Sequence, residues 1–578
     1  MKKIILLVVL FFGVLMASAQ SFEEYKKQAQ KEFSDYKEEQ NRAFREYRDK
    51  VNSQYASYMR GAWKSFEITE AIEIPELPEP PKPVVRDPEE KVSADPILFK
   101  EVVMPPAPRP EPPKPIIPIE ALEEDVEQEE IEEEIIDTIP TPDPVVDDEP
   151  EVVTPPAPKP EPEPTPDPVV DDEPIVTPPA PKPEPEPTPD PVVDDEPEVV
   201  TPPAPKPEPK PAPDPDANKF TFNIYGTKCA VSLKDTHQFT LKGVDENSVA
   251  DTWELLSTDK YNIIVAEALT LRDKLKLSDW GYFRLLEEMT TSFLGKNAVN
   301  EARVLQLFIL VQSGYNVRIA RTDDHIALLL PFDTTLYQFN YFTLDGTKYY
   351  IVDRSGKFQN YFIFNRKFPN EQILSTNISQ SPAFDKSLTT PKSFSVNNIA
   401  VEVSLNKNLL DFYTDFPLNS SWIHYSSASV SEELRNALFP KLKADIADKS
   451  EQEAVQTLLS FVQHAFDYKT DQEQFGYERP LFSDETFYYP YADCEDRSIL
   501  FAELVRELVG LDVVLLFYNN SPSEQHLATA VKFNSQIQGD YFNLSNEKFI
   551  ICDPTYIGAS IGMAMPMYKT SSATIYSF

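Results

Sequence analysis

Three residues near the C-terminal end of the chain have the types and the order that catalysis by sulfur needs. Cys494 begins an apolar-periodic stretch, His526 begins an alternating stretch, and Asp553 ends another. The thiolate is the reactive form of cysteine, and a helix N-terminus and a neighbouring imidazolium both lower the thiol pKa. An aspartate orients the ring of the base. We therefore predict Cys494 as nucleophile, His526 as base and Asp553 as orienting group.

Each of these residues also has a structural alternative. Cys494 can be a buried thiol, or it can form a disulfide with Cys552 in an oxidising compartment. His526 can be a packed strand residue, and Asp553 precedes a proline and can start a turn. Cys552 is expected on the opposite face of its strand from Asp553, because side chains alternate along a strand. The backbone N–H of Cys494 is one oxyanion donor, and the candidates for a second are Tyr488, Tyr489 and Tyr491.

The C-terminal region contains two copies of one unit. Residues 300–310 and 494–504 align as apolar-periodic helices. A Val-rich strand follows each helix, at 316–320 and at 512–517, and then come a histidine and a hairpin that ends in aspartate. The same motifs in the same order at similar spacing indicate a duplication, with its boundary near 385–396.

The first copy lacks the nucleophile. His325 and Asp353 match the histidine and aspartate of the second copy, but Asn300 stands where the cysteine would be. An amide cannot act as a thiolate. We therefore predict an inactive domain over 218–390 and an active domain over 397–578. The inactive copy would widen a shared groove, hold substrate or brace the active copy.

The context of the three residues resembles the transglutaminase-like superfamily of cysteine enzymes. The resemblance rests on Asp-Cys-Glu-Asp-Arg at 493–497, His-Leu-Ala-Thr from His526, Asp-Pro-Thr-Tyr from Asp553, and the stretch that leads up to them from 458 to 486. It implies an α+β fold of two tandem papain-like domains, with Asp496 structuring the helix start. It also implies acyl transfer at amides through a thioester: hydrolysis, crosslinking, deamidation or deglycosylation.

The N-terminus is typical of an export signal. Residues 1–19 combine a basic start, an apolar run and a small-x-small end. The run is too short to span a bilayer, which takes about 20 residues. We therefore predict a cleaved signal peptide and an exported protein without a transmembrane segment, periplasmic or secreted.

Residues 20–66 are expected to form a long amphipathic helix. Aromatic residues recur every eleven positions, and eleven residues make three helical turns, so the rows stay on one face. One row is Phe22, Phe33, Phe44, Tyr55 and Phe66, and another is Tyr25, Tyr36, Tyr47 and Tyr58. Self-association into a homo-oligomer, docking on the folded domains and a position on a membrane surface are the three alternatives for covering this face.

Residues 67–217 are expected to be a disordered, acidic linker. They hold 45 of the 56 prolines and carry 43 acidic against 10 basic residues, which leaves a net charge of −33 out of −41. Three near-identical repeats start at Thr141, Thr165 and Thr188. Alternating proline and charge prevents helix and sheet and favours extended polyproline II. In composition the linker resembles the spacers of Gram-negative periplasm-spanning proteins.

The composition and the motifs leave two functions. No basic stripe is available for nucleic acid, and no metal-ligand spacing, phosphate loop or dinucleotide fingerprint is present, so we predict no cofactor. The first function is an exported cysteine hydrolase or acyltransferase that acts on a protein or peptide substrate, such as a peptidoglycan peptide. The alternative is a non-catalytic envelope protein that binds a partner through the duplicated fold and spans a gap with its linker.

Overall fold

The computed structural model describes two blocks of the chain and several short segments. The described residues are Lys27, Lys31, Ser34, 36–74, 84–93, 96–97, 102–103, 219–352, 360–369, 371–519 and 525–578. The predicted signal peptide and the three repeats lie outside them, as does Asp353. None of the described helices is long and apolar enough to cross a membrane.

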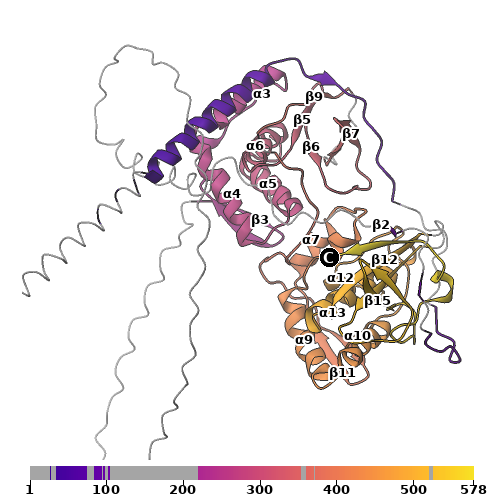
Figure 1. Cartoon of the computed structure of the whole chain (residues 1–578). Coiled ribbons are helices and arrows are strands. Elements are labelled where there is room, and N and C mark those ends of the chain that lie inside the picture. Colours follow the sequence, from indigo (N-terminus) through magenta and orange to yellow (C-terminus); the bar gives the residue numbers. More distant parts are fainter. Residues whose placement is uncertain are drawn as a thin grey trace, which may run out of the picture. The chain divides into compact units, whose positions relative to one another are not determined.

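The part of the chain from 219 onward contains two series of helices, each followed by antiparallel strands, which agrees with the predicted α+β class (Figure 1). The first series is β3 (Phe220–Ile224), β4 (Thr227–Val231), α3 (Glu246–Leu256), α4 (Asn262–Lys274), α5 (Asp279–Leu294), α6 (Val299–Gln312), β5 (Arg318–Arg321), β6 (Ile326–Pro331), β7 (Tyr341–Leu344), β8 (Thr347–Ile351) and β9 (Phe362–Phe364).

The second series is longer, because it carries more helices before its sheet. It comprises β10 (Lys392–Val396), β11 (Ile399–Val403), α7 (Lys407–Thr414), α8 (Trp422–Ser426), α9 (Glu432–Ile446), α10 (Glu451–Ala465), α11 (Asp471–Gln474), α12 (Ser483–Tyr488), α13 (Cys494–Leu508), β12 (Asp512–Asn519), β13 (Gln525–Lys532), β14 (Tyr541–Leu544), β15 (Glu547–Cys552) and β16 (Ala573–Ser577).

The two large sheets share one strand order. The first runs β1-β9-β5-β6-β8-β7 and the second runs β2-β16-β12-β13-β15-β14, where β1 is Lys64–Ser65 and β2 is Val102–Val103. In the first sheet, β5 follows α6 and pairs antiparallel with β6, which begins directly after His325. In the second sheet, β12 follows α13 and pairs antiparallel with β13, which contains His526. The sheets therefore agree, strand for strand, with the alignment of the two sequence segments.

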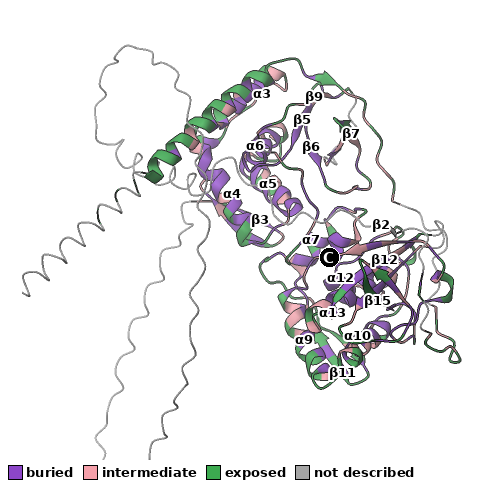
Figure 2. Ribbon diagram, viewed as in Figure 1, coloured by how far each residue is buried: buried purple, intermediate pink, exposed green. Residues whose placement is uncertain are grey.

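Each sheet is covered by the helix that precedes it. Helix α13 is buried on nearly its whole circumference from Glu495 to Val505, as expected for a helix enclosed by its own domain. Its apolar residues share a core with alternate residues of β12 and β13, including Leu515, Leu527 and Val531. The other face of the same sheet packs in a separate core with Leu516, Ala528 and Ala530. Figure 2 shows these interior elements as buried.

The N-terminal helix docks on the first domain through one side only. The described residues Lys27, Lys31, Ser34 and 36–59 are helical, and the helix ends at Met59 rather than at the predicted residue 66. Tyr55, Ala56 and Met59 are buried in the core of the first domain, whereas Tyr36, Tyr47 and Tyr58 are 60%, 43% and 43% exposed. Docking on the first domain therefore covers only part of the aromatic face, on the side that includes Asn52, which bonds Gln312. Covering of the second row by self-association or by a membrane surface stays a prediction.

We predict that Tyr55→Ala lowers the free energy of unfolding by about 3–5 kcal/mol, the usual range for removing a buried aromatic side chain. The Tyr55 ring lies 4.8 Å from the ring of Trp253 and 4.9 Å from that of Phe368, measured between centroids. Denaturant unfolding monitored by circular dichroism measures the change. Tyr47→Ala is the matched control and should change the free energy of unfolding by less than about 0.5 kcal/mol. A loss in Tyr55→Ala as small as the loss in Tyr47→Ala would show that the helix is not docked in solution.

Part of the segment predicted as linker lies on the sheets. We call residues 64–74, 84–93, 96–97 and 102–103 the strap. Its backbone bonds the edge of the first sheet through Thr69 and Tyr341, at 2.8 and 3.1 Å. It then bonds the second domain through Arg86 N to Ile557 O at 3.0 Å and Ile97 N to Tyr541 O at 2.7 Å. Edge positions of a sheet tolerate proline, because few backbone N–H groups have to donate there. A proline-rich segment can therefore pair with a sheet edge, and composition alone did not locate the start of the linker.

Candidate active site

Cys494 is the first residue of helix α13, and buried polar contacts hold this helix start in place. Asp496 accepts hydrogen bonds from the backbone N–H of Asp493 at 3.3 Å and of Leu481 at 2.9 Å. Arg497 donates to the backbone carbonyls of Ala492, Gln463 and Phe466. The predicted structural role of Asp496 agrees with these contacts.

The Cys494 thiol is free and partly exposed, but its surroundings do not favour the thiolate. Cys552 is also free, so the structure contains no disulfide between these two described residues. The thiol donates to Glu495 Oε2 at 3.1 Å. Burial and the carboxylate of Asp493 raise the pKa of the thiol far above its ordinary value, although a hydrogen bond from the backbone of Leu527 acts in the opposite direction. In this state Cys494 is a thiol at neutral pH.

His526 and Asp553 form the pair that the sequence predicts. His526 Nε2 donates to Asp553 Oδ2 at 2.9 Å, and each side chain is only 3% exposed. Asp553 Oδ1 accepts from the backbone N–H of Thr555 at 2.9 Å and from its hydroxyl at 2.7 Å. Burial alone would raise the pKa of Asp553, but the interactions with His526 and Thr555 outweigh it and the pKa is lowered. The pair is therefore a fixed imidazole and an ionised carboxylate.

The thiol and the imidazole approach β13 from different sides. Leu527, which follows His526, faces α13, and Ser498 of α13 donates to its carbonyl at 2.8 Å. The His526 ring stacks with Tyr518 and Tyr568 at centroid distances of 6.1 and 4.9 Å, in register with Tyr518 on the other face of the sheet. Among the described residues no hydrogen bond joins Cys494 Sγ to the His526 ring. The structure therefore brings His526 and Asp553 into contact, whereas Cys494 lies beside Leu527, the next residue of the strand.

The first domain holds Asn300 at the corresponding place. Asn300 Oδ1 accepts from the backbone N–H of Ile326 at 2.9 Å, and its Nδ2 donates to the carbonyl of Asp324 at 2.9 Å. Ile326 follows His325 in the sequence, just as Leu527, whose backbone bonds the Cys494 thiol, follows His526. His325 is 37% exposed and contacts Asp324 rather than a nucleophile. In this copy the side chain at the helix start ties the helix to the strand and has no reactive group.

Five acidic residues gather around the thiol. One carboxylate oxygen from each of Asp471, Glu478 and Glu495 lies within 4.8 Å of the others, and the same holds for Asp471, Asp493 and Asp496. Asp493 Oδ1 and Glu495 Oε1 are buried and accept no hydrogen bond from the described residues. Calcium and other hard divalent cations prefer such oxygen ligands. These five side chains, which we call the carboxylate cluster, therefore have the donor set for a divalent cation.

Burial dominates the titration of the carboxylate cluster. It raises the pKa of Asp493 to about 7, with Glu478 adding to the effect, and it raises the pKa of Glu478 to about 7 as well. The pKa values of Asp471, Glu495 and Asp496 are raised too, by burial and then by their acidic neighbours. Like charges at this separation must be neutralised by protons or by a cation.

We predict that the metal-free protein loses stability as pH rises from about 4 to about 7. The folded chain holds protons at Asp493 and Glu478 up to about pH 7, whereas unfolded carboxyls release them near pH 4. The folded chain binds these protons more tightly than the unfolded chain does. The free energy of unfolding is therefore highest below about pH 4 and falls as pH rises. Thermal unfolding in chelator should show a drop of about 5 °C. The double variant Asp471→Asn with Glu478→Gln should flatten this slope; a melting temperature that rises over the window would contradict the prediction.

Sequence reasoning missed several residues of this site. Gln463 donates to the backbone carbonyls of Asp553, Tyr556 and Ala559 and so holds the turn that carries the aspartate. Asp471 and Glu478 come from the stretch before Cys494, and their only sequence signal is the acidic pattern that flanks the cysteine. The rings of Tyr488, Tyr489 and Tyr491 contact the cationic groups of Lys392, Arg479 and Lys469, and a second oxyanion donor among them stays a prediction.

Comparisons with protein-family models, with curated proteins and with solved structures give no match to this chain. The site must therefore be interpreted from its own geometry.

Proposed function

We propose that this protein is an exported cysteine enzyme of the transglutaminase-like kind that transfers or hydrolyses acyl groups at peptide-like amides. The observation that carries the proposal is the buried His526–Asp553 pair, at 2.9 Å, at the head of the strand whose next residue contacts Cys494. A fixed imidazole–carboxylate pair, and a partly exposed cysteine at a helix N-terminus near the same strand, are the parts that thiol catalysis uses.

The proposed reaction has two halves. Cys494 Sγ gives its proton to His526 and bonds the carbonyl carbon of the substrate, and the helix N-terminus stabilises the oxyanion. The C–N bond then breaks, the amine leaves with the proton from the imidazolium, and a thioester remains. Water loses a proton to the imidazole, attacks the thioester, and releases the acid and the thiol. The step requires Sγ and the ring, which lie on different sides of β13 in this structure, to come within about 3.2 Å of each other in the substrate complex.

The carboxylate cluster gives this enzyme a cation requirement. A divalent ion held by Asp471, Glu478 and Glu495 would neutralise the charges that keep the thiol protonated, and it would put a positive charge close to the sulfur. A nearby cation favours the thiolate. We therefore include a divalent cation, of the calcium type, as an activator of Cys494.

The proposal predicts that Cys494→Ala abolishes covalent labelling by an electrophilic amide probe that forms a thioester. Asn300→Ala should leave labelling unchanged, because an amide is not a nucleophile and the Asn300 side chain bonds the backbone of residues 324 and 326. Intact-mass spectrometry of the labelled protein measures both. Equal labelling of the wild type and Cys494→Ala would refute the enzymatic function.

A non-catalytic envelope protein is the second candidate. Two observations favour it: the carboxylates raise the pKa of the Cys494 thiol, and the His526 ring stacks on the face of the sheet away from α13. In that case no probe would label Cys494 at any cation concentration, and the duplicated fold would act only in binding.

A further inference from the structure

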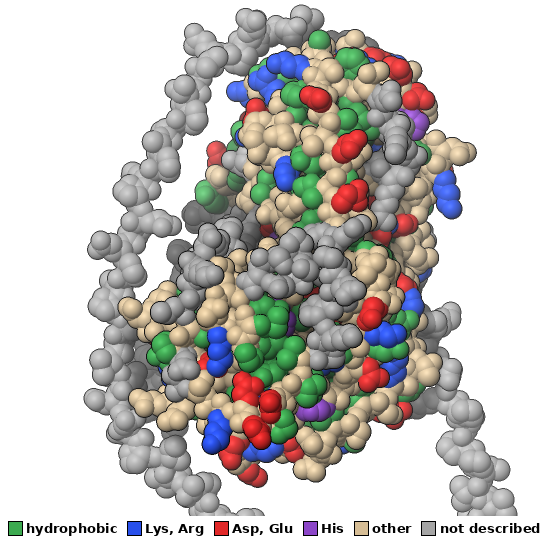
Figure 3. All heavy atoms as spheres, turned by 90° about the vertical axis from the view of Figure 1, so that its right-hand side faces the viewer, with side chains coloured by type: hydrophobic (Ala, Val, Ile, Leu, Met, Phe, Trp, Pro, Cys, Tyr) green, Lys and Arg blue, Asp and Glu red, His purple; other side chains and the backbone are tan. Residues whose placement is uncertain are grey.

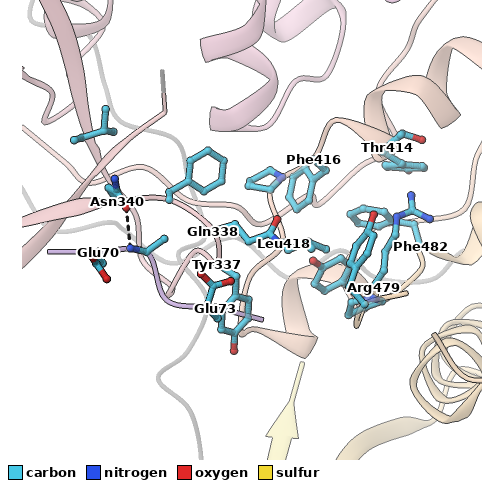
Figure 4. A pocket seen from close by; sticks show the side chains of 18 of the residues that line it. Glu70, Glu73, Tyr337, Gln338, Asn340, Thr414, Phe416, Leu418, Arg479 and Phe482 are labelled. Carbon is cyan, nitrogen blue, oxygen red and sulfur yellow. Dashed lines mark hydrogen bonds between the residues drawn. The ribbon is translucent and has the colours of Figure 1, made fainter. Parts of the chain in front are cut away.

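A cavity of about 1000 Å³ lies where the strap and both domains meet (Figure 4). One wall is strap residues 68–73, the second is the loop before β7, around Tyr337 and Gln338, and the third is formed by residues 413–425 and 477–482 of the second domain. This volume is at the upper end of the range for small-ligand sites. The inactive first domain therefore supplies part of a cavity that the second domain alone would not form.

The walls of the cavity are fixed by hydrogen bonds between the segments. Ala71 N donates to Asn340 Oδ1 at 2.8 Å, as the dashed line in Figure 4 shows. Gln338 N donates to Ile72 O at 2.8 Å, and Tyr337 N donates to Leu418 O at 3.0 Å. A wall held in this way is preformed, which lowers the entropy cost of binding a ligand.

The lining is aromatic. Phe482 stacks on Tyr413 with a centroid distance of 4.1 Å, and Phe416 and Tyr425 pack around it at 5.3 and 5.1 Å. These rings are buried and form the floor. Tyr477, by contrast, is 41% exposed at the rim. Aromatic faces carry partial negative charge and attract cations.

The charge available to a ligand in this cavity is negative. Glu70 and Glu73 line it with exposed carboxylates, and no ion pair within the described residues engages either of them. The one guanidinium in the lining, that of Arg479, is already paired with Glu485 at 2.6 Å, with side chains 7% and 2% exposed. On the face shown in Figure 3, acidic and basic side chains are interspersed. The carboxylates of Glu70 and Glu73, three residues apart along the strap, are therefore the exposed charged groups in the described lining of this cavity.

We propose that this cavity binds a cationic peptide segment, with lysine or arginine side chains of the peptide at the carboxylates of Glu70 and Glu73 and against the ring of Tyr477 at the rim. Carboxylates and aromatic faces together favour a cation, and a cavity open to solvent at an edge admits an extended chain. This site goes beyond the proposed catalysis, because binding there does not require the Cys494 thiol. It assigns a function to the first domain, which has lost its nucleophile.

The test uses the mature full-length protein with Cys494→Ala, so that no reaction occurs. A fluorescein-labelled peptide of alternating arginine and leucine is titrated with the protein, and binding is followed by anisotropy. The double variant Glu70→Gln with Glu73→Gln should weaken binding about tenfold, and high salt should weaken it further. The control double variant Glu67→Gln with Asp448→Asn removes the same charge from exposed positions outside the cavity and should bind like the parent.

Two results would overturn the proposal. The first is equal affinity of the parent and the Glu70/Glu73 double variant for the arginine peptide. The second is displacement of the peptide by a neutral chito-oligosaccharide at a comparable concentration, because that would make the cavity a carbohydrate site. Tyr477→Ala provides a second variant, expected to weaken binding severalfold without a change in circular dichroism. Since Cys494→Ala is present throughout, failure of the catalytic proposal leaves these outcomes unchanged.

Discussion

Calcium ions are expected to accelerate the alkylation of Cys494 by iodoacetamide about a hundredfold at pH 7, relative to the protein in chelator. Without a cation, burial and the Asp493 carboxylate hold the thiol in its protonated form. Each unit by which the thiol pKa falls raises the thiolate fraction about tenfold, and the thiolate is the form that reacts. An ion in the carboxylate cluster acts on this equilibrium directly.

The measurement is mass spectrometry of the peptide that contains Cys494, over a time course. Cys229 and Cys552 serve as internal references, because they are 3% and 0% exposed. The double variant Asp471→Asn with Glu478→Gln removes two ligands and should abolish the effect of calcium. Rates that do not depend on the cation in the wild type would show that the cluster is neutralised by protons alone.

The second large effect is expected at the base. His526→Ala should lower the rate of acyl transfer about a thousandfold, within the usual contribution of a general base. Asp553→Asn should cost a comparable factor, because the amide cannot stabilise the imidazolium and reverses the preferred tautomer. The buried contact at 2.9 Å makes Asp553 the fixed partner of the ring.

Hydrolysis of the amide substrate identified with the probe measures this loss, in the presence of calcium. His325→Ala is the matched control: it changes the corresponding histidine of the first domain, which is 37% exposed and contacts Asp324. Its rate should equal that of the wild type. If His526→Ala kept full activity while folding normally, the base would have to be sought elsewhere, and the His526–Asp553 pair would be structural.

The duplicated fold has a physical consequence for the first domain. The Asn300 side chain makes two hydrogen bonds to the backbone at the place where Cys494 carries a free thiol in the second domain. Replacing a reactive group with an amide leaves the local packing intact, since the helix start remains tied to the strand. A domain changed in this way keeps its fold and is free to serve as one wall of a cavity.

The sequence by itself determined the elements and their order. Helix α13 was expected over 494–504 and is found at Cys494–Leu508, and the strand expected at 512–517 is β12, Asp512–Asn519. The contact between His526 and Asp553 was also foreseeable, because both stand at the ends of neighbouring strands. The periodicity of apolar residues indicates which side chains are buried. The two aligned segments also predict the same elements in the same order.

Only the tertiary structure decided which face the His526 ring occupies, which acidic residues surround the thiol, and where the strap pairs with the two sheets. Alternation along a strand gives two faces without saying which one the helix covers. Asp471, at the start of α11, and Glu478, in the loop that follows this helix, approach Cys494 from the segment before α12, and Glu70 and Glu73 reach the cavity by edge pairing of a proline-rich segment. Such contacts between segments distant in sequence arise from packing and backbone hydrogen bonding, which local patterns do not encode.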